Sequence, residues 1–330
     1  MSLRSERTKW VMFLPCSSAE VDTRHIFDLV YGVFCLERAG ISPQDIFVYI
    51  DSPSLNYDSF FSFASTTPYV SKTTQDFFSD IEENTYENIV MFVTGHGSPF
   101  GLDGISNISP NKLITSLKNT PNLKNAIIYL GQCYAGTFNY VNAGKSRDEV
   151  VDIIIVGATN LNQSLSSTTA EDFLPPGLKI PWVANVFLLY VFKWMSSPRD
   201  IDGDGVNTIM DSYKYAGVCS NEANKQSKTK GFVNVMDLLQ DYVKARDLLK
   251  EKLEAQAQAA PEAEAAPEAE AAPEAAPEAA PEAEAEADDD LDDEVDCKAK
   301  EDIYLGQLAL HHVHQECWIL NSRPAQTIEF

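Results

Sequence analysis

Basic residues are scarce in this sequence of 330 residues. Lys and Arg number 25 against 49 Asp and Glu, which gives a formal net charge of −24 at pH 7. Surfaces that bind nucleic acid or anionic membranes need clustered Lys and Arg, so we expect neither partner. Long apolar runs are lacking too. The longest, near residues 181–195, contains Asn185 and Lys193 and is shorter than the about 20 residues that span a bilayer.

Cysteine is also sparse. The six cysteines stand at positions 16, 35, 133, 219, 297 and 317, and no two of them have the CxxC spacing. This spacing argues against a zinc ribbon and against a small scaffold held by disulfides. The N-terminal residues 1–6 are polar and lead directly into an apolar run, so no signal peptide is expected. We therefore expect a soluble, cytoplasmic protein.

Short apolar runs that end in turn residues are the main structural signal. They occupy residues 10–14, 46–50, 89–94, 126–130 and 153–158. Most are continuous rather than alternating, which is typical of strands buried on both faces. Helical patterns occur between them, at residues 23–39, 69–83 and 110–118. This alternation predicts an α/β domain with a mainly parallel sheet.

The composition changes sharply in the last third of the chain. Residues 181–195 are predicted to form a buried helix, and residues 233–253 an amphipathic one that ends the first globular region, residues 1–253. The segment 254–297 repeats Ala, Pro and Glu and then becomes acidic, which predicts a disordered linker because periodic proline blocks a continuous helix. Residues 298–330, with strands expected at 303–310 and 316–320, are too few for a separate domain. We expect them to pack back onto the first region.

Two of the apolar runs lead directly into residues that carry chemistry. His96 follows one run between two glycines, and Cys133 follows another, with Gly136 three positions later. The carboxyl ends of parallel strands meet at one edge of a sheet, so the two side chains are expected to lie together. A neighbouring His accepts the proton of a Cys thiol and so produces the nucleophilic thiolate. The backbone N–H groups of Gly97 and Cys133 are candidates to stabilise an oxyanion.

These residues resemble the signatures of a known family. His96-Gly97, and Cys133 followed by Ala135-Gly136, are similar to the His-Gly and Cys motifs of clan CD cysteine peptidases. That group includes legumains, caspases and metacaspases, and legumain-like and bacterial caspase-like members are the most similar. The resemblance covers about residues 8–220. It implies a caspase-like three-layer α/β sandwich and an endopeptidase that cleaves protein or peptide substrates through a Cys/His dyad and an acyl-enzyme intermediate.

Two positions depart from the family pattern. Gly131 stands where many members carry an acidic residue that shapes the substrate pocket, and Gln132 stands where Ala or Ser is common. The specificity of the family is therefore not transferred to this chain. By position after the strands, the candidate substrate-binding residues are Cys16, Ser17, Gln163 and Ser164. The alternative for these segments is that they are ordinary polar loops.

Two other functions fit the same motifs. One is a catalytically inactive, calcium-stabilised interaction protein with this fold, which the departures at Gly131 and Gln132 favour. The other is a transpeptidase or ligase, in which an amine rather than water attacks the acyl-enzyme. The intact pair of His96 and Cys133 favours an enzyme over the inactive protein.

A calcium-binding pattern follows the predicted buried helix. Four carboxylates stand at loop positions 1, 3, 5 and 12, namely Asp200, Asp202, Asp204 and Asp211, and Gly205 occupies position 6. This spacing fits an EF-hand loop in which Asp replaces the usual Glu at position 12. The backbone carbonyl of Val206 and the side chain of Thr208 complete the expected ligand set. The alternative is an acidic surface turn that holds no ion; a structural Ca²⁺ ion is the predicted cofactor.

A histidine cluster near the C-terminus is the last candidate. His311, His312 and His314 stand within four positions, and two of them would share one face of a strand. We favour a surface cluster over a metal site, because Cys317 does not lie at a spacing typical of zinc ligands.

Overall fold

The computed structural model describes residues 2–18, 21–52, 56–145, 151–259, 284–311 and 315–330. The chain divides into two compact units. The first comprises Met1–Ser227 and Val313–Phe330, and the second comprises Lys228–His312. The boundary expected at residue 253 therefore lies inside the second unit.

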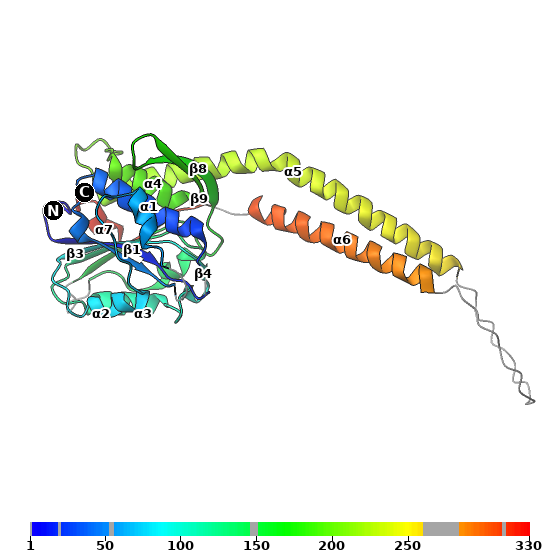
Figure 1. The fold of residues 1–330 in the computed structure, drawn as a ribbon, viewed down its shortest axis with the longest axis horizontal. Coiled ribbons are helices and arrows are strands. Elements are labelled where there is room, and N and C mark those ends of the chain that lie inside the picture. The colour runs from blue at the N-terminus through cyan, green and yellow to red at the C-terminus, as the bar shows by residue number, and fades with distance from the viewer. Residues whose placement is uncertain (1, 19–20, 53–55, 146–150, 260–283, 312–314) are drawn as a thin grey trace, which may run out of the picture. The chain divides into compact units, whose positions relative to one another are not determined.

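A six-stranded sheet forms the centre of the first unit (Figure 1). Its strands are β1 (Thr8–Leu14), β2 (Ile46–Ile50), β3 (Asn88–Val93), β6 (Asn125–Leu130), β7 (Asp152–Gly157) and β10 (Trp318–Leu320). Their order is β10-β7-β6-β3-β1-β2, and only the pairing of β10 with β7 is antiparallel. All five predicted apolar runs lie in strands, so the predicted α/β fold with a mainly parallel sheet is confirmed.

Helices cover both faces of the sheet. One hydrophobic cluster joins the sheet to α1 (Thr23–Arg38) and α4 (Val186–Ser196), and the other joins it to α2 (Thr74–Asp80) and α3 (Pro110–Lys118). Along β1, Trp10 and Met12 belong to the first cluster, whereas Val11 and Phe13 belong to the second. Because both faces of each strand are buried, neither face needs polar residues, which explains the continuous apolar runs.

Smaller elements complete the first unit. They are β4 (Gly97–Ser98), β5 (Gly101–Leu102), β8 (Ser166–Phe173), β9 (Leu178–Asn185), α7 (Ser322–Ala325) and the 3₁₀ turns Pro43–Asp45, Asp58–Phe63 and Ala135–Tyr140. The single helix predicted over residues 181–195 is wrong in its first part. Residues up to Asn185 form β9, which pairs with β8, and α4 begins at Val186. Exposed and buried residues alternate in β9, as expected of a hairpin strand with one solvent face.

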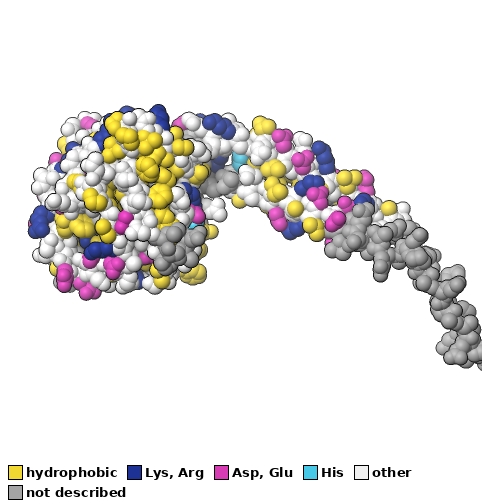
Figure 2. Space-filling model, in the orientation of Figure 1, with side chains coloured by type: hydrophobic (Ala, Val, Ile, Leu, Met, Phe, Trp, Pro, Cys, Tyr) yellow, Lys and Arg dark blue, Asp and Glu magenta, His cyan; other side chains and the backbone are white. Residues whose placement is uncertain are grey.

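The second unit contains the latter part of α5 (Ile209–Ala259) and α6 (Glu284–His311). The rings of Tyr242 and Tyr304 stack at 6.0 Å between centroids, and the Tyr242 hydroxyl donates to Glu301. Acidic and basic side chains are interleaved over these helices (Figure 2), as in the pairs of Lys298 with Glu301 and of Lys300 with Asp296. None of the described helices combines the length and the apolar character that a membrane span requires.

Two expectations for this region need correction. Residues 303–310, predicted as a strand, lie in α6, because the face that carries Cys297, Glu301 and Tyr304 has helical spacing. The expected disordered linker, residues 254–297, is helical at residues 254–259 and 284–297, where Ala and Glu favour a helix and proline is absent. Its proline-rich part, residues 260–283, lies outside the described residues. The strand expected at 316–320 is β10.

Candidate active site

The candidate site lies where the strand order reverses. The chain runs from β1 to β2 on one side, and then crosses to β3 on the other side of β1. In such sheets, ligands bind beyond the carboxyl ends of the strands next to this point. The segments that follow β1, β3 and β6 provide Asp22 and His25, His96, and Cys133 respectively.

His96 and Cys133 are placed by the pairing of β3 with β6. The strands are parallel with Val93 opposite Leu130, so each of the two residues follows its strand by the same number of positions. A Cβ atom added to Gly97 would lie 2.3 Å from the carbonyl oxygen of Cys133. Only glycine permits this close approach of the two backbones. The structure therefore brings the His-Gly and Cys segments into contact, with about half of the His96 side chain exposed and Cys133 partly buried.

A strained turn follows Cys133. Tyr134 has a positive φ of 56°, which is rare for a residue with a Cβ atom. Its N–H donates to the carbonyl of Asn162 at 2.8 Å, and the N–H of Gly136 donates to that of Asn160 at 3.1 Å. A side chain at Gly136 would collide with Asn160. The turn thus directs the chain away from β6 at Cys133 and holds the loop of residues 158–165 against it.

Buried polar contacts connect Cys133 to the rest of the unit. The Ser164 N–H donates to Cys133 Sγ at 3.4 Å. Asn185 donates through Nδ2 to the carbonyl of Gly131 at 2.5 Å and to Ser164 Oγ at 3.2 Å. Its own N–H donates to Asp28 Oδ1 at 3.1 Å, and its Oδ1 caps α4 by accepting from Leu188. Asn185 therefore fixes both segments that border the thiol.

The geometry explains the departure from the family pattern at Gly131. A Cβ atom at this position would lie 2.6 Å from Leu188 Cδ1 and 3.0 Å from Asn185 Oδ1. An acidic side chain two residues before Cys133 would thus collide with the start of α4. Gln132 is buried against Gly97 rather than directed to solvent.

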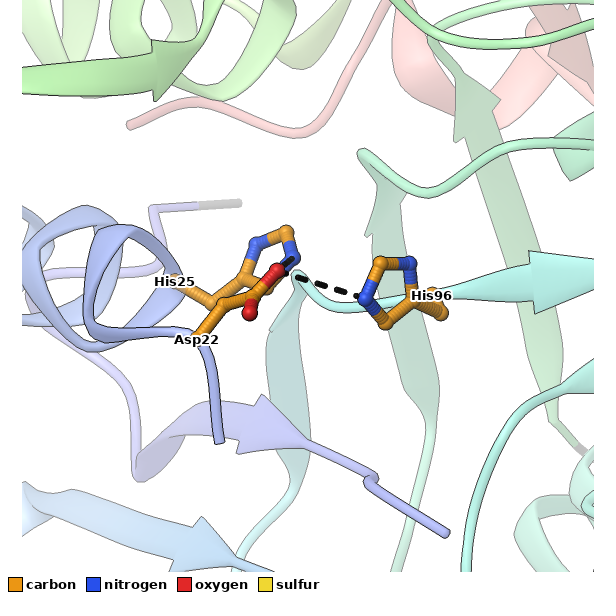
Figure 3. A group of neighbouring side chains, drawn as sticks. All are labelled: Asp22, His25 and His96. Atoms are coloured by element: carbon orange, nitrogen blue, oxygen red, sulfur yellow. Dashed lines mark ion pairs between the residues drawn. The ribbon is translucent and has the colours of Figure 1, made fainter. Parts of the chain in front are cut away.

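A cluster of two histidines and one carboxylate borders this edge (Figure 3). His96 Nε2 lies 3.4 Å and His25 Nε2 4.0 Å from the same oxygen, Oδ2 of Asp22. The two rings meet edge to face with centroids 5.3 Å apart. Burial lowers the pKa of His25, which favours its neutral form. Burial raises the pKa of Asp22, but Arg24 and both histidines outweigh this and leave it below its usual value.

The four candidate substrate-binding residues have different environments. Cys16 is buried and its thiol contacts Ser18, whereas Ser17 and Gln163 are exposed. Of the four, Ser164 contacts Cys133 directly. The sequence interpretation did not identify Asp22, His25, Asp28 or Asn185. The first three stand three residues apart at the start of α1, a helical spacing that marks one polar stripe.

The predicted calcium loop has a partly convergent ligand set. The carboxylates of Asp200, Asp202 and Asp204 lie within 4.8 Å of one another and are exposed. Backbone N–H groups, first that of Gly205, lower the pKa of Asp200 against the opposing effect of desolvation, so it is held as a carboxylate. Asp202 pairs with Lys214 at 2.6 Å.

Asp211 occupies a different environment from the other three carboxylates. It is buried and accepts from the N–H groups of Ile201 and Thr208 and from the Thr208 hydroxyl. Val206 and Thr208, the remaining expected ligands, follow within the same loop. The acidic loop therefore suits a hard cation at three carboxylates, while Asp211 closes the loop onto the start of α5.

Comparison with known proteins gives a distant likeness, and only among solved structures. No protein-family model matches the sequence, and no curated protein matches it. Among solved structures, the chain is similar to a secreted C11 cysteine protease from Bacteroides thetaiotaomicron, solved in complex with an irreversible peptide inhibitor. The two are 10% identical with a TM-score of 0.34, and the match covers 66% of this chain and 59% of that chain.

Proposed function

We propose that the protein is a cysteine endopeptidase in which Cys133 is the nucleophile and His96 the general acid and base. The observation that carries the proposal is the contact between the His96-Gly97 and Gln132-Cys133 segments beyond β3 and β6. Two conditions for nucleophilic catalysis support it: a partly exposed thiol and an imidazole on an adjacent segment of the same sheet edge. The legumain-like resemblance of the motifs agrees with this proposal.

The proposed reaction follows from the groups present. His96 takes the thiol proton, and the Cys133 sulfur attacks the scissile carbonyl carbon. The N–H groups of Gly97 and Cys133 stabilise the oxyanion, and His96 then protonates the departing amine nitrogen as the C–N bond breaks. Water hydrolyses the resulting thioester. Because Nε2 of His96 faces Asp22, we assign the proton transfer to Nδ1 and the orientation of the ring to Asp22.

We further propose that a structural Ca²⁺ ion binds the acidic loop. Asp200, Asp202 and Asp204 would hold it, with the Val206 carbonyl and Thr208 as further oxygen ligands. The ion would offset the mutual repulsion of three neighbouring carboxylates and so stabilise the connection from α4 to α5.

The test is cleavage of a peptide library by the full chain, with and without Ca²⁺. We expect Cys133→Ala to lower turnover at least about a thousandfold, His96→Ala to do nearly the same, and the double variant to add little, because the two act as a unit. Cys219→Ala, a half-buried thiol on α5, is the matched control and should retain wild-type turnover. Wild-type turnover in a purified Cys133→Ala sample would refute the assignment.

The same assay separates the alternatives. An inactive interaction protein would cleave no peptide, and iodoacetamide would not label Cys133 faster than Cys219. A transpeptidase would transfer the acyl group to an added amine in preference to water.

A further inference from the structure

We propose that Asp22, His25 and His96 form a binding site for a divalent transition-metal ion with the ligand preference of zinc. The three ligand atoms lie within 4.8 Å of one another. They belong to the loop after β1, to α1 and to the loop after β3 (Figure 3). If His96 serves the peptidase as proposed above, an ion held here withdraws it from catalysis, so the site is also inhibitory.

The hydrogen bonds of His25 prepare it as a metal ligand. The Thr94 hydroxyl donates its only hydrogen to Asp28 Oδ2 at 2.9 Å. The contact of His25 Nδ1 with Thr94 Oγ1 at 3.1 Å must therefore use the hydrogen on Nδ1. Asp28 Oδ2 lies 3.7 Å from the same nitrogen, and its negative charge also favours a hydrogen there. With its hydrogen on Nδ1, the neutral ring presents a bare lone pair at Nε2, the arrangement found in metal-binding histidines.

The lone pair of His25 has no other use in the structure. His25 is buried, and its Nε2 has no hydrogen-bond partner among the described residues. A buried acceptor without a partner is unfavourable, which favours occupation of the space in front of it. That space is bordered by the carboxylate of Asp22 and the ring of His96.

The distances suit a small tetrahedral ion. Ligand atoms about 2.0–2.1 Å from zinc lie about 3.3 Å apart in a tetrahedral site. His96 Nε2 and Asp22 Oδ2 are already 3.4 Å apart. The 4.0 Å between His25 Nε2 and the same oxygen requires a small shift of Asp22, whose side chain is half exposed. Arg24 donates to this oxygen at 3.3 Å and would be displaced toward Oδ1 or solvent.

The ligand types select the class of ion. Two imidazole nitrogens and one carboxylate oxygen suit zinc and its neighbours in the transition series, whereas Ca²⁺ and Mg²⁺ prefer oxygen alone. The site is thus distinct in chemistry from the acidic loop of Asp200, Asp202 and Asp204. Three protein ligands leave the fourth position to water.

Zinc binding to the full chain tests the proposal without any measurement of activity. Calorimetric titration with Zn²⁺ would be done in excess Ca²⁺, which saturates the acidic loop, and in the Cys133→Ala background, which removes the candidate nucleophile as a ligand. We expect one site whose Kd rises at least tenfold in His25→Gln and in Asp22→Asn. Co²⁺ should give a tetrahedral visible spectrum that His25→Gln abolishes. Asp22→Asn changes an exposed residue, so it provides a variant that folds if His25→Gln does not.

The tail histidines provide the matched control. The chain has five histidines, two in the proposed site and three at 311, 312 and 314. Replacement of these three by Ala should leave the Kd unchanged. Loss of binding in this variant with retention in His25→Gln would overturn the proposal, as would loss of binding in Cys133→Ala, which would indicate a Cys/His site instead.

Inhibition is a separate outcome that also depends on the peptidase assignment. The Zn²⁺ concentration for half-inhibition should match the Kd and should rise at least tenfold in His25→Gln, whatever its basal rate. Binding without peptidase activity would leave the metal site standing and refute the proposed function. Peptidase activity without zinc binding would refute the metal site and leave the proposed function standing.

Discussion

The backbone N–H of Ser164 donates to the sulfur of Cys133 across 3.4 Å, although 31 positions separate the two residues. This donor comes from the loop of residues 158–165, which the strained turn at Tyr134 holds in place. The environment of the thiol is thus set by segments outside the His-Gly and Cys motifs.

Asn185→Asp should impair both stability and turnover. Asp retains the acceptor that caps α4 but loses the two N–H donors to Gly131 and Ser164, and it directs a negative charge at a carbonyl. We expect a loss of about 1–3 kcal/mol in the free energy of unfolding from the unsatisfied buried groups. Urea denaturation measures it. An unchanged free energy of unfolding in Asn185→Asp would show that these contacts do not hold the loop.

Gly131→Ala should destabilise the first unit by about 1–3 kcal/mol, because its methyl group would overlap Leu188 and the side chain of Asn185. Gly217→Ala is the control. That glycine is helical, and an added Cβ meets only Cys317 at an ordinary 3.7 Å. The free energy of unfolding of this variant should therefore be unchanged or higher by about 0.5–1 kcal/mol. Equal melting temperatures for the two variants would contradict the packing argument.

Asp22→Asn should separate orientation from binding. The amide keeps the shape of Asp22 but weakens the charge-assisted contact with His96 Nε2. We expect kcat to fall about tenfold while KM stays near the wild-type value, because the role assigned to Asp22 is to orient His96 and not to bind the peptide. Steady-state kinetics in the presence of a chelator, which removes any zinc, provide the measurement. An effect on KM alone would indicate that Asp22 contacts substrate rather than His96.

Millimolar Ca²⁺ should raise the melting temperature of the full chain. An ion that binds only the folded state adds about 2.7 kcal/mol at a hundredfold excess over its Kd. Mg²⁺ should stabilise less, because it dehydrates reluctantly and demands octahedral geometry. Asp200→Ala or Asp204→Ala should erase the difference between the two ions. Identical melting curves in Ca²⁺ and in chelator, with no metal in the purified protein by elemental analysis, would refute the calcium site.

A cut within residues 260–283 should leave the two fragments associated. Strand β10 pairs with β7 through Trp318–Leu320, the carbonyl of Glu329 accepts from the Leu3 N–H, and Gln315 accepts from the N–H of Leu165. A site-specific protease site inserted in that segment, followed by gel filtration without denaturant, tests this. Separate elution of the fragments would show that the tail is not held by the sheet.

The sheet could be predicted because its strands are short apolar runs that end in turn residues. The same reasoning failed where an apolar composition was the only signal, because it does not distinguish a strand from a helix. Residues 181–185 lead directly into the apolar run of α4, so the alternation over β9 was hidden by the helical run that follows. His96 and Cys133 could be named as candidates because each follows a strand within a short motif. Asp28 and Asn185 were not, because they meet across 157 positions only after α1 packs beside α4.

The position of β10 in the chain has a consequence for synthesis. The 85 residues of the second unit, Lys228–His312, must be translated before the last strand, which takes about 4–17 s at about 5–20 residues per second. Until then β7 is an open edge, and the carbonyl of Thr159 lacks its Trp318 donor and Leu165 its Gln315 acceptor. Both residues lie in the loop of residues 158–165, which contacts Cys133. A ribosome-bound chain therefore carries Cys133 and His96 for several seconds before β10 can complete the edge of the sheet at β7.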